Sequence, residues 1–307
     1  MSDAACRTRV RGFAPWSPRA DARVLLEQVL TVLDEYREHL PITLRQLFYR
    51  LVGTRGYEKT EQAYKRLGEL LNRARRAELI PFAAIRDDGV TARPAPGWAS
   101  VAAFVTTVRE NVEDFTLDRQ QGQPQRLILM CEAAGMVPQL ERVAHFYGVE
   151  VLSSGGFDST TAKHDLACKI AWIGRDHDTN VEILHVGDHD PSGVHVFQSL
   201  AEDVRAFAAA MEEGGVEFTR LAVTPEQALE LALPTAPAKR TDRRRFAGIG
   251  GDTSATVQAE AIPPDVLARI VQEAIDGRLD RAAFRAVLEA EKHAKAELAR
   301  MLARIVP

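Results

Sequence analysis

The sequence lacks several features that would assign it quickly to a class of proteins. It has no run of about 18 apolar residues, so we expect no membrane-crossing helix. Residues 1–23 contain five arginines but no continuous apolar stretch, so we expect neither a signal peptide nor an anchor there. The three cysteines (Cys6, Cys131 and Cys168) are widely separated and form no CxxC pair. This argues against a cysteine zinc site and favours reduced thiols in the cytoplasm.

The composition is that of a globular enzyme, with 46% hydrophobic and 27% charged residues among 307, enough for two domains. A net charge of -4 excludes a wholly basic nucleic-acid coat. The charge is uneven, however, because residues 43–78 hold nine Lys or Arg against four acids. Such a local excess attracts a phosphate backbone.

The N-terminal part reads as a small helical domain. Hydrophobic periodicity predicts three helices and a short strand, at residues 21–39, 44–52, 60–78 and 82–86. Thr43 and Thr60 are suited to cap the second and third helices. This order predicts a winged-helix (helix-turn-helix) domain over residues 1–92, followed by a linker and one helix over residues 93–125.

From Arg126 onwards strands alternate with helices. We expect strands at 127–130, 149–152, 181–186 and 216–223, and helices at 137–146, 159–173 and 194–211. This α/β alternation predicts a parallel sheet flanked by helices over residues 126–307, with a C-terminal helical extension at 264–305. In such sheets the chemistry sits at the carboxyl ends of the strands.

Three acids fall at those strand ends. Glu132 follows the first strand of the sheet, and Asp188 and Asp190 follow the third. Carboxylates from neighbouring strand ends can converge on Mg²⁺, which prefers oxygen ligands. Solvated loop carboxylates are the alternative, and a zinc site from His185, His189 and His195 is a weaker one, since carboxylates suit magnesium better.

Three segments resemble a Toprim domain: LILMCEAAG at 127–135, SSGGFD at 153–158 and HVGDHDPSG at 185–193. The resemblance is to the A subunits of type IIB DNA topoisomerases and their meiotic double-strand-break relatives. It implies Mg²⁺ ligands at Glu132, Asp188 and Asp190, and a turn near the phosphates at Gly155 and Gly156. Ser192 stands where those subunits often have an aromatic residue.

The second predicted helix carries a candidate nucleophile. On a helical wheel its apolar residues cluster on one face, whereas Tyr49 falls outside that face beside Arg45. A neighbouring guanidinium favours the phenolate and can hold a phosphate, which suits attack on a phosphodiester. The alternative is a tyrosine that rims the core or contacts the DNA backbone.

The same helix is similar to the catalytic helix of the type IIB family, which carries Arg-x-x-aromatic-Tyr. Residues 45–49 (RQLFY) match it, with Tyr49 in the nucleophile position. Gln46 replaces a commonly acidic residue, and Phe48 replaces a frequent tyrosine. Residues 256–267 also resemble a late stretch of the A subunits, so the resemblance spans roughly residues 22–275.

Basic residues supply the expected DNA contacts. On the third helix Lys65, Arg66, Arg73 and Arg76 lie largely opposite a buried stripe. We expect this face to meet DNA phosphates, although a solvated face is the ordinary explanation. Residues 239–245 are a second candidate contact, with a solvated loop as the alternative.

The resemblance implies an Mg²⁺-dependent transesterase in which Tyr49 attacks DNA and stays linked to a 5′ end. In the family two chains form a homodimer, and each tyrosine works with the partner's metal site. The sequence has no GxxxxGK[ST] loop, so an ATPase B-type subunit would have to act in trans. A metal-dependent nuclease without a covalent intermediate and a non-catalytic DNA-binding module remain as alternatives.

Overall fold

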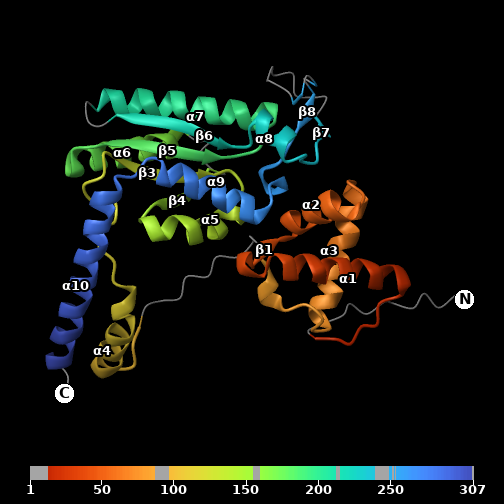
Figure 1. Ribbon diagram of the computed structural model, residues 1–307, viewed down its shortest axis with the longest axis horizontal. Coiled ribbons are helices and arrows are strands. Elements are labelled where there is room, and N and C mark those ends of the chain that lie inside the picture. The colour runs from red at the N-terminus through yellow and green to blue at the C-terminus, as the bar shows by residue number, and fades with distance from the viewer. Residues whose placement is uncertain are drawn as a thin grey trace, which may run out of the picture.

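The computed structural model describes residues 13–86, 97–154, 160–211, 215–238 and 249–305, other than 251 and 253. It is a mixed α/β structure, mostly helical, built on a parallel sheet with helices on both faces (Figure 1). An N-terminal helical unit lies at one end of the sheet, and an arm of two helices extends from the other end.

The N-terminal unit contains the three predicted helices. They are α1 (Ala20–Glu35), α2 (Leu44–Arg55) and α3 (Glu61–Arg76). The Thr43 and Thr60 hydroxyls cap α2 and α3, as predicted, by accepting hydrogen bonds from backbone amides in the first helical turn. Short strands β1 (Ile42–Thr43) and β2 (Ile85–Arg86) pair in parallel.

Two details differ from the sequence prediction for this unit. The first helix ends at Glu35 and gives way to a 3-10 turn, and residues 82–84, predicted as strand, form another such turn. No β-hairpin is found within residues 13–86. A wing after β2 would fall on residues 87–96, which lie outside the described residues, so the winged-helix assignment stays a prediction.

The central sheet has four strands in the order β4-β3-β5-β6, all parallel. Their bounds are Gln125–Cys131 (β3), Glu150–Ser153 (β4), Asn180–Val186 (β5) and Val216–Ala222 (β6). All four were predicted within a few residues, because buried β-branched and apolar runs separated by helices are typical of parallel strands.

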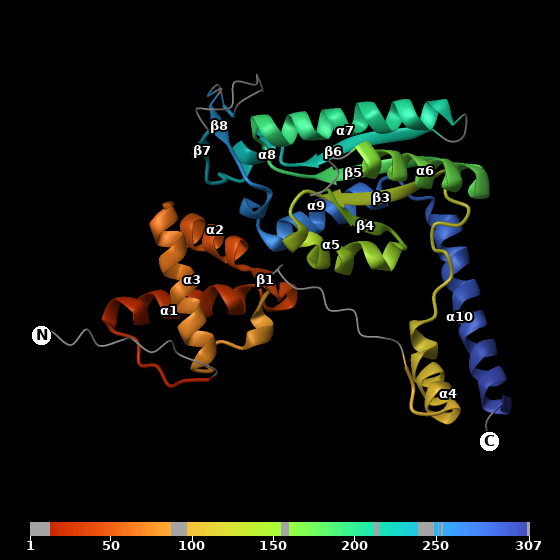
Figure 2. The ribbon, with the colours of Figure 1, turned by 180° about the vertical axis from the view of Figure 1, so that it is seen from behind.

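The two faces of the sheet are covered by different helix pairs. Leu127 and Leu129 of β3 pack in one core cluster with α5 (Val137–Ala144) and α9 (Pro264–Asp276). Their neighbours Ile128 and Met130 pack in a second cluster with α6 (Thr160–His177) and α7 (Pro191–Ala210). Successive side chains of a strand point to opposite faces, so a continuous apolar run fills both layers (Figures 1 and 2).

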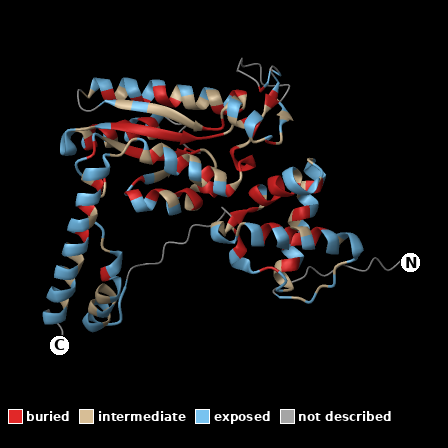
Figure 3. Ribbon diagram, in the orientation of Figure 1, coloured by how far each residue is buried: buried red, intermediate tan, exposed pale blue. Residues whose placement is uncertain are grey.

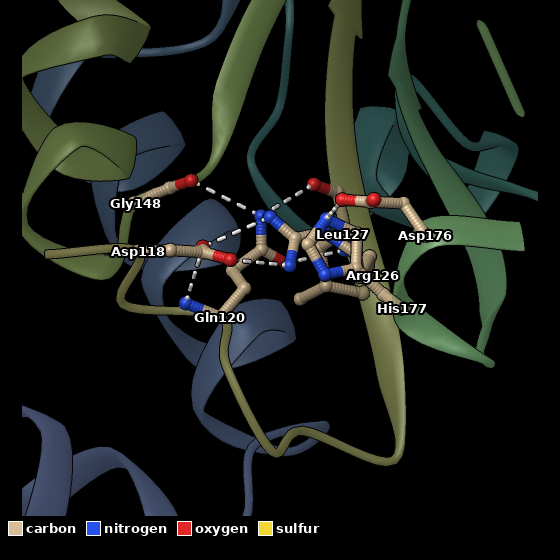
Figure 4. A network of polar contacts seen from close by, with 7 residues as sticks. All are labelled: Asp118, Gln120, Arg126, Leu127, Gly148, Asp176 and His177. Carbon is tan, nitrogen blue, oxygen red and sulfur yellow. Dashed lines mark hydrogen bonds and ion pairs between the residues drawn. The ribbon is translucent and has the colours of Figure 1, made fainter. Parts of the chain in front are cut away.

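A polar network fixes the loop that enters β3 (Figure 4). Arg126 pairs with both carboxylate oxygens of Asp118, at 2.7 and 2.9 Å. The Gln120 amide donates to the carbonyls of Leu127 and Gly148, and its oxygen accepts from the Leu127 amide. This loop is therefore tied to β3 and to the turn before β4.

The arm consists of α4 (Val101–Glu110) and α10 (Arg281–Ile305), which lie side by side in both views. Arg109 donates to the Leu302 carbonyl at 3.0 Å. The predicted helical region 264–305 is therefore two helices, α9 and α10, separated after Asp276. Buried residues concentrate on the sheet and α2, whereas α4 and α10 are largely exposed (Figure 3).

One core cluster joins the N-terminal helices to the α5–α9 face of the sheet. The junction runs through α2 and a short 3-10 turn, η6 (Ala259–Ala261). Before η6 the chain forms the helix α8 (Pro225–Glu230) and the short strands β7 (Ala236–Pro237) and β8 (Ala255–Thr256). Among the described residues, no helix is long and apolar enough to cross a membrane.

Candidate functional site

The structure brings the three predicted acids together at the carboxyl ends of β3 and β5. The backbone amide of Asp188 donates to Glu132 Oε2 at 3.0 Å. A Cβ atom added at Gly193 would lie 3.1 Å from Glu132 Oε2 and 3.3 Å from Asp190 Oδ1. Gly193 therefore sits between the carboxylates of both strand ends, as the parallel-sheet rule predicts.

Glycine is required at a second position beside these acids. A Cβ at Gly187 would lie 2.4 Å from His185 Cε1 and 2.8 Å from Glu132 Oε2, well inside van der Waals contact. A side chain there would have to displace the His185 ring and the Glu132 carboxylate. The glycines of the motif at residues 185–193 thus allow the close approach of the two strand ends.

The acids repel one another and are partly removed from water. Burial, and then the charges of Asp188 and Asp190, raise the pKa of Glu132 to about 7. Burial is also the main cause of a raised pKa at Asp188, with Asp190 adding to it. Clustered carboxylates with raised pKa values are typical of sites that hold a cation or transfer protons.

Arg220 at the end of β6 lies against these acids and was missed in the sequence. Its Nη2 donates to the backbone carbonyls of Gly187, at 3.0 Å, and of Asp188. Its Nη1 is buried without a hydrogen-bond partner among the described residues. Arg220 lowers the pKa values of Glu132 and Asp188 against the effect of burial. The sequence signal that could have indicated Arg220 is its charge near the carboxyl end of a predicted strand.

Two of the acids also accept hydrogen bonds from backbone amides. Asp190 caps α7 by accepting from the Gly193 amide at 2.6 Å, and Asp188 Oδ1 accepts from the Ala259 amide at 2.8 Å. In the parts of the chain that the structure describes, no group of three His, Cys, Asp or Glu has the arrangement of a metal site. Carboxylate oxygens are nevertheless the ligands that Mg²⁺ prefers, so these three acids are the residues that would hold such an ion.

Tyr49 lies in a different environment from the predicted one. The helical wheel placed it outward, but only 6% of its surface is exposed. Six consecutive residues of α2, from Gln46 to Leu51, are buried, so the helix is covered on all sides. Burial raises the pKa of Tyr49 to about 12, which outweighs the lowering effect of Arg45. The prediction that Tyr49 points outward is therefore wrong, whereas its role as nucleophile stays a prediction.

The cover over α2 is a short segment around η6, and three consecutive residues of it contact the predicted site. The Tyr49 hydroxyl donates to Gln258 Oε1 at 2.6 Å. The next residue, Ala259, donates to Asp188 as described above. Glu260 follows and forms a 3.7 Å ion pair with Arg45. The segment 258–260 thus joins the tyrosine helix to the acidic loops.

A cavity of about 220 Å³ opens beside Tyr49. It is lined by Arg45, Phe48, Tyr49, Lys59, Thr60, Glu61, Tyr64 and Gln258. The Lys59 ammonium lies 5.4 Å from the centre of the Tyr49 ring and donates to the carbonyls of Pro234 and Thr235. Burial lowers the pKa of Lys59 to about 8, so it is still largely protonated at neutral pH. The cavity therefore presents two cations next to the phenol.

The basic face of α3 is exposed in the structure. Lys65 pairs with the exposed Glu61 at 2.7 Å. Arg66 pairs with the exposed Glu58 at 3.8 Å and donates to the Tyr57 hydroxyl at 3.3 Å. Arg66 and Arg73 line a second cavity, of about 540 Å³, with Trp16 and Arg19. Arg76 is partly buried, and its Nε donates to Asn72. Exposed pairs of this kind cost little to break, so the side chains are available to phosphates.

Other predicted site residues stand apart from this geometry. Gly155, Gly156 and residues 239–245 lie outside the described residues. His185 packs against Phe197, with ring centres 4.6 Å apart, and burial lowers its pKa to about 3. His189 is buried and pairs through its backbone with Val257.

Gln258 and Glu260 were also missed. Residues 256–267 were singled out only for their resemblance to a late stretch of the A subunits, and nothing in their own pattern indicates contact with residue 49.

Comparison of the chain with family models, with curated proteins and with solved structures finds no match.

Proposed function

We propose that the protein is an Mg²⁺-dependent DNA-cleaving transesterase related to the A subunits of type IIB topoisomerases, with Tyr49 as nucleophile. One observation carries the proposal. Tyr49 and Asp188 are held by adjacent residues, since the phenol bonds to Gln258 and the carboxylate to the Ala259 amide. This link between a tyrosine and an acidic cluster, separately predicted from two motifs, supports the proposal.

The proposed reaction exchanges one phosphoester for another. The Tyr49 oxygen forms a bond to a DNA phosphorus, and the bond from that phosphorus to the 3′ oxygen breaks. In net terms the phenolic proton passes to the departing 3′ oxygen, which leaves as a hydroxyl, and the 5′ phosphate stays on the protein. Because no net charge or redox change occurs, the exchange needs no further reactant and is reversible.

The chain's own groups have distinct parts in this proposal. Arg45 and Lys59 face the cavity next to Tyr49 and would hold the phosphate and share its developing charge. Glu132, Asp188 and Asp190 would hold Mg²⁺, which when bound supplies positive charge to phosphate oxygens. The basic face of α3 would position the duplex through its backbone.

A metal-dependent nuclease is the second candidate, and the burial of Tyr49 favours it. A phenol with a pKa raised to about 12 is a poor nucleophile at neutral pH. In that case water attacks the phosphorus, and Tyr49 only supports the wall of the cavity. Both candidates require the acids, and only the first requires the phenol oxygen.

The test is incubation of the protein with supercoiled plasmid and Mg²⁺, followed by denaturation and a search for protein on 5′ DNA ends. The transesterase predicts covalent adducts that disappear in Tyr49→Phe. Tyr147→Phe is a matched control, because Tyr147 is equally buried but lies in the core near Phe284.

Free nicked or linear DNA that persists in Tyr49→Phe but not in Asp188→Ala would instead establish the nuclease. DNA binding without cleavage by any variant, with or without added ATPase subunits, would leave the chain as a DNA-binding module.

A further inference from the structure

We infer that a single unpaired nucleotide binds in the cavity of about 540 Å³ that Trp16 and Arg19 line together with part of α3. In the inferred arrangement the phosphate lies at Arg19 and Arg73, and the base lies against Trp16. The inference goes beyond the proposed function, because this cavity shares no lining residue with the cavity beside Tyr49. Its ligand is therefore independent of the cleavage chemistry.

Three parts of the N-terminal unit line this cavity. The segment 13–19, which leads into α1, runs against α3, where the Ala14 amide donates to the Arg76 carbonyl at 2.9 Å. The start of α1 and the connection that carries Tyr57 complete the lining. A volume of about 540 Å³ falls within the range of roughly 300–1,000 Å³ that small-molecule sites occupy. The cavity is therefore large enough for a ligand of nucleotide size.

Two guanidinium groups at the cavity have no partner in the part of the chain that the structure describes. The side chains of Arg19 and Arg73 line the cavity, are exposed, and form no ion pair or hydrogen bond there. Arg66, the third arginine of the lining, is held by Glu58 and by the Tyr57 hydroxyl. Guanidinium groups bind phosphate through paired N–H donors. Arg19 and Arg73 are therefore available for a phosphate.

The start of α1 adds a second feature that favours an anion. Arg19 is the N-cap residue of this 16-residue helix, and its side chain forms no cap hydrogen bond. Asp21 and Ala22 of the first turn line the cavity. The first amides of a helix have no partner within the helix and lie at the positive end of its dipole, so they bind phosphates. A helix start and two available arginines thus lie at one cavity.

Trp16 provides a surface for a base. The indole packs against the hydrophobic core and also lines the cavity. It contacts no other ring and no cation among the described residues, so no such group competes for it. The core packing holds the indole in place, and apolar Val24 and Leu70 line the same cavity. Stacking on an aromatic side chain adds roughly 5- to 150-fold in affinity per base.

Two carboxylates also line the cavity and select among anions. Asp21 and Glu69 stand against three guanidinium groups, which leaves an excess of only one positive charge. A bare phosphate is therefore attracted weakly. A nucleotide suits both signs of charge, because carboxylates accept hydrogen bonds from the amino groups of bases while arginines bind its phosphate.

The base must be unpaired, because in a duplex neighbouring bases cover the faces of each ring and none can stack on Trp16. A free nucleotide and an unpaired stretch of DNA offer the same chemistry. DNA is the source that fits the proposed function, since Arg73 also belongs to the basic face of α3 that would meet the duplex. An unpaired DNA end would then enter the cavity beside the bound duplex.

The first measurement is the fluorescence of Trp16 in a chain with Trp98→Phe and Trp172→Phe, which removes the other two tryptophans, both exposed. We expect saturable quenching by dAMP and by a single-stranded oligo(dA), and no competition by the same concentration of inorganic phosphate. Quenching by the oligonucleotide alone would assign the cavity to a DNA strand, and quenching by dAMP alone to a free nucleotide. No saturable quenching by either, or equal competition by phosphate, would overturn the inference.

A pair of arginine variants locates the phosphate in the same assay. Arg19→Ala should weaken binding of the quenching ligand by about tenfold, the loss expected for one charge-assisted contact to phosphate. Arg23→Ala is the matched control, because Arg23 is exposed one turn further along α1 and does not line the cavity. Equal losses in the two variants would show a general effect of charge and contradict the inferred site.

Labelled DNA separates contact with the base from contact with the backbone. Trp16→Ala should weaken binding of a single-stranded oligonucleotide by about tenfold and change binding of a blunt duplex by less than twofold. Trp98→Ala, at an exposed tryptophan before α4, is the control. Equal weakening of both DNAs by Trp16→Ala would refute a base on Trp16.

Arg19→Glu, an exposed change, repeats the comparison of the two DNAs if Trp16→Ala does not fold. These measurements use neither Mg²⁺ nor cleavage, so a failure of the proposed function would leave their outcome unaffected.

Discussion

Gln46 in α2 and Gln139 in α5 share a buried hydrogen bond of 2.5 Å between Nε2 and Oε1. Gln46 also completes the cap of its own helix, because its Oε1 accepts from the Thr43 amide at 2.9 Å. One side chain thus fixes both the start of the tyrosine helix and its position on the sheet. This gives a structural role to a residue that replaces a commonly acidic one in the resembling family.

Gln46→Ala should destabilise the protein by about 2 kcal/mol, since it leaves Gln139 with an unpaired buried oxygen and weakens the cap. The measurement is chemical denaturation, with Gln62→Ala on the exposed side of α3 as the control, for which we expect a change within about 0.5 kcal/mol. Equal effects at both positions would show that the bond to Gln139 contributes nothing.

The pH dependence of stability should report on Glu132. Its pKa rises from 4.5 to about 7 on folding, so the folded state binds more protons between these values. The stability that protonated Glu132 contributes to the metal-free protein is fully present below about pH 4.5 and is lost as the pH rises to about 7. Glu132→Gln resembles the protonated form and should be more stable than wild type at pH 8, by on the order of 2 kcal/mol.

The comparison is made by denaturation at pH 5 and pH 8, with Glu141→Gln in exposed α5 surface as the control. The gain in stability of Glu132→Gln over wild type should become smaller towards pH 5. Added Mg²⁺ should stabilise wild type at pH 8 but stabilise the variant much less. An advantage that is the same at both pH values would argue against a raised pKa at this carboxyl.

The basic face of α3 should control DNA affinity without sequence preference. Arg73→Ala should weaken binding to unrelated duplexes by similar factors and reduce the slope of log affinity against log salt by about 1. Lys292→Ala, an exposed change on α10, serves as the control. If both variants bind with the same salt slope as wild type, the duplex does not lie on α3.

The buried ion pair between Arg119 and Glu291 should anchor α10. Glu291 accepts two hydrogen bonds from this guanidinium, at 2.7 and 3.0 Å, and is 5% exposed. Glu291→Gln should cost about 3 kcal/mol, because it leaves the largely covered charge of Arg119 without its partner. Glu289→Gln, an exposed change on the same helix, should cost little, and thermal unfolding of both variants would show the difference.

The sequence was sufficient to predict the sheet and the acids at its edge. Strand runs such as residues 127–130 are apolar because both faces are covered, and the carboxyl ends of parallel strands lie together whatever the helices between them do. The meeting of Glu132 with Asp188 and Asp190 follows from these two rules. The hydrogen bonds that Asp190 and Asp188 accept from backbone amides do not follow from these rules, because they depend on the conformation of the loops.

The surroundings of Tyr49 could not be predicted in the same way. A helical wheel describes which side of α2 faces its own domain, and it gave that side correctly. The opposite side is covered by residues 258–260, more than 200 positions later in the chain. Such contacts are fixed by the docking of whole elements, and neither the apolar spacing of α2 nor that of residues 256–267 encodes them. Arg220 was missed for a similar reason, since only the sheet order places β6 beside β5.

The order of the chain gives the segment 258–260 one more consequence. Tyr49 and Gln258 are 209 positions apart, and Asp188 and Ala259 are 71 apart. On the ribosome both the tyrosine helix and the acidic loops emerge well before the residues that join them. A chain interrupted between residues 190 and 258 therefore contains Tyr49, Glu132, Asp188 and Asp190 but lacks the residues that join them, so synthesis of about the last sixth of the chain is needed to complete the proposed site.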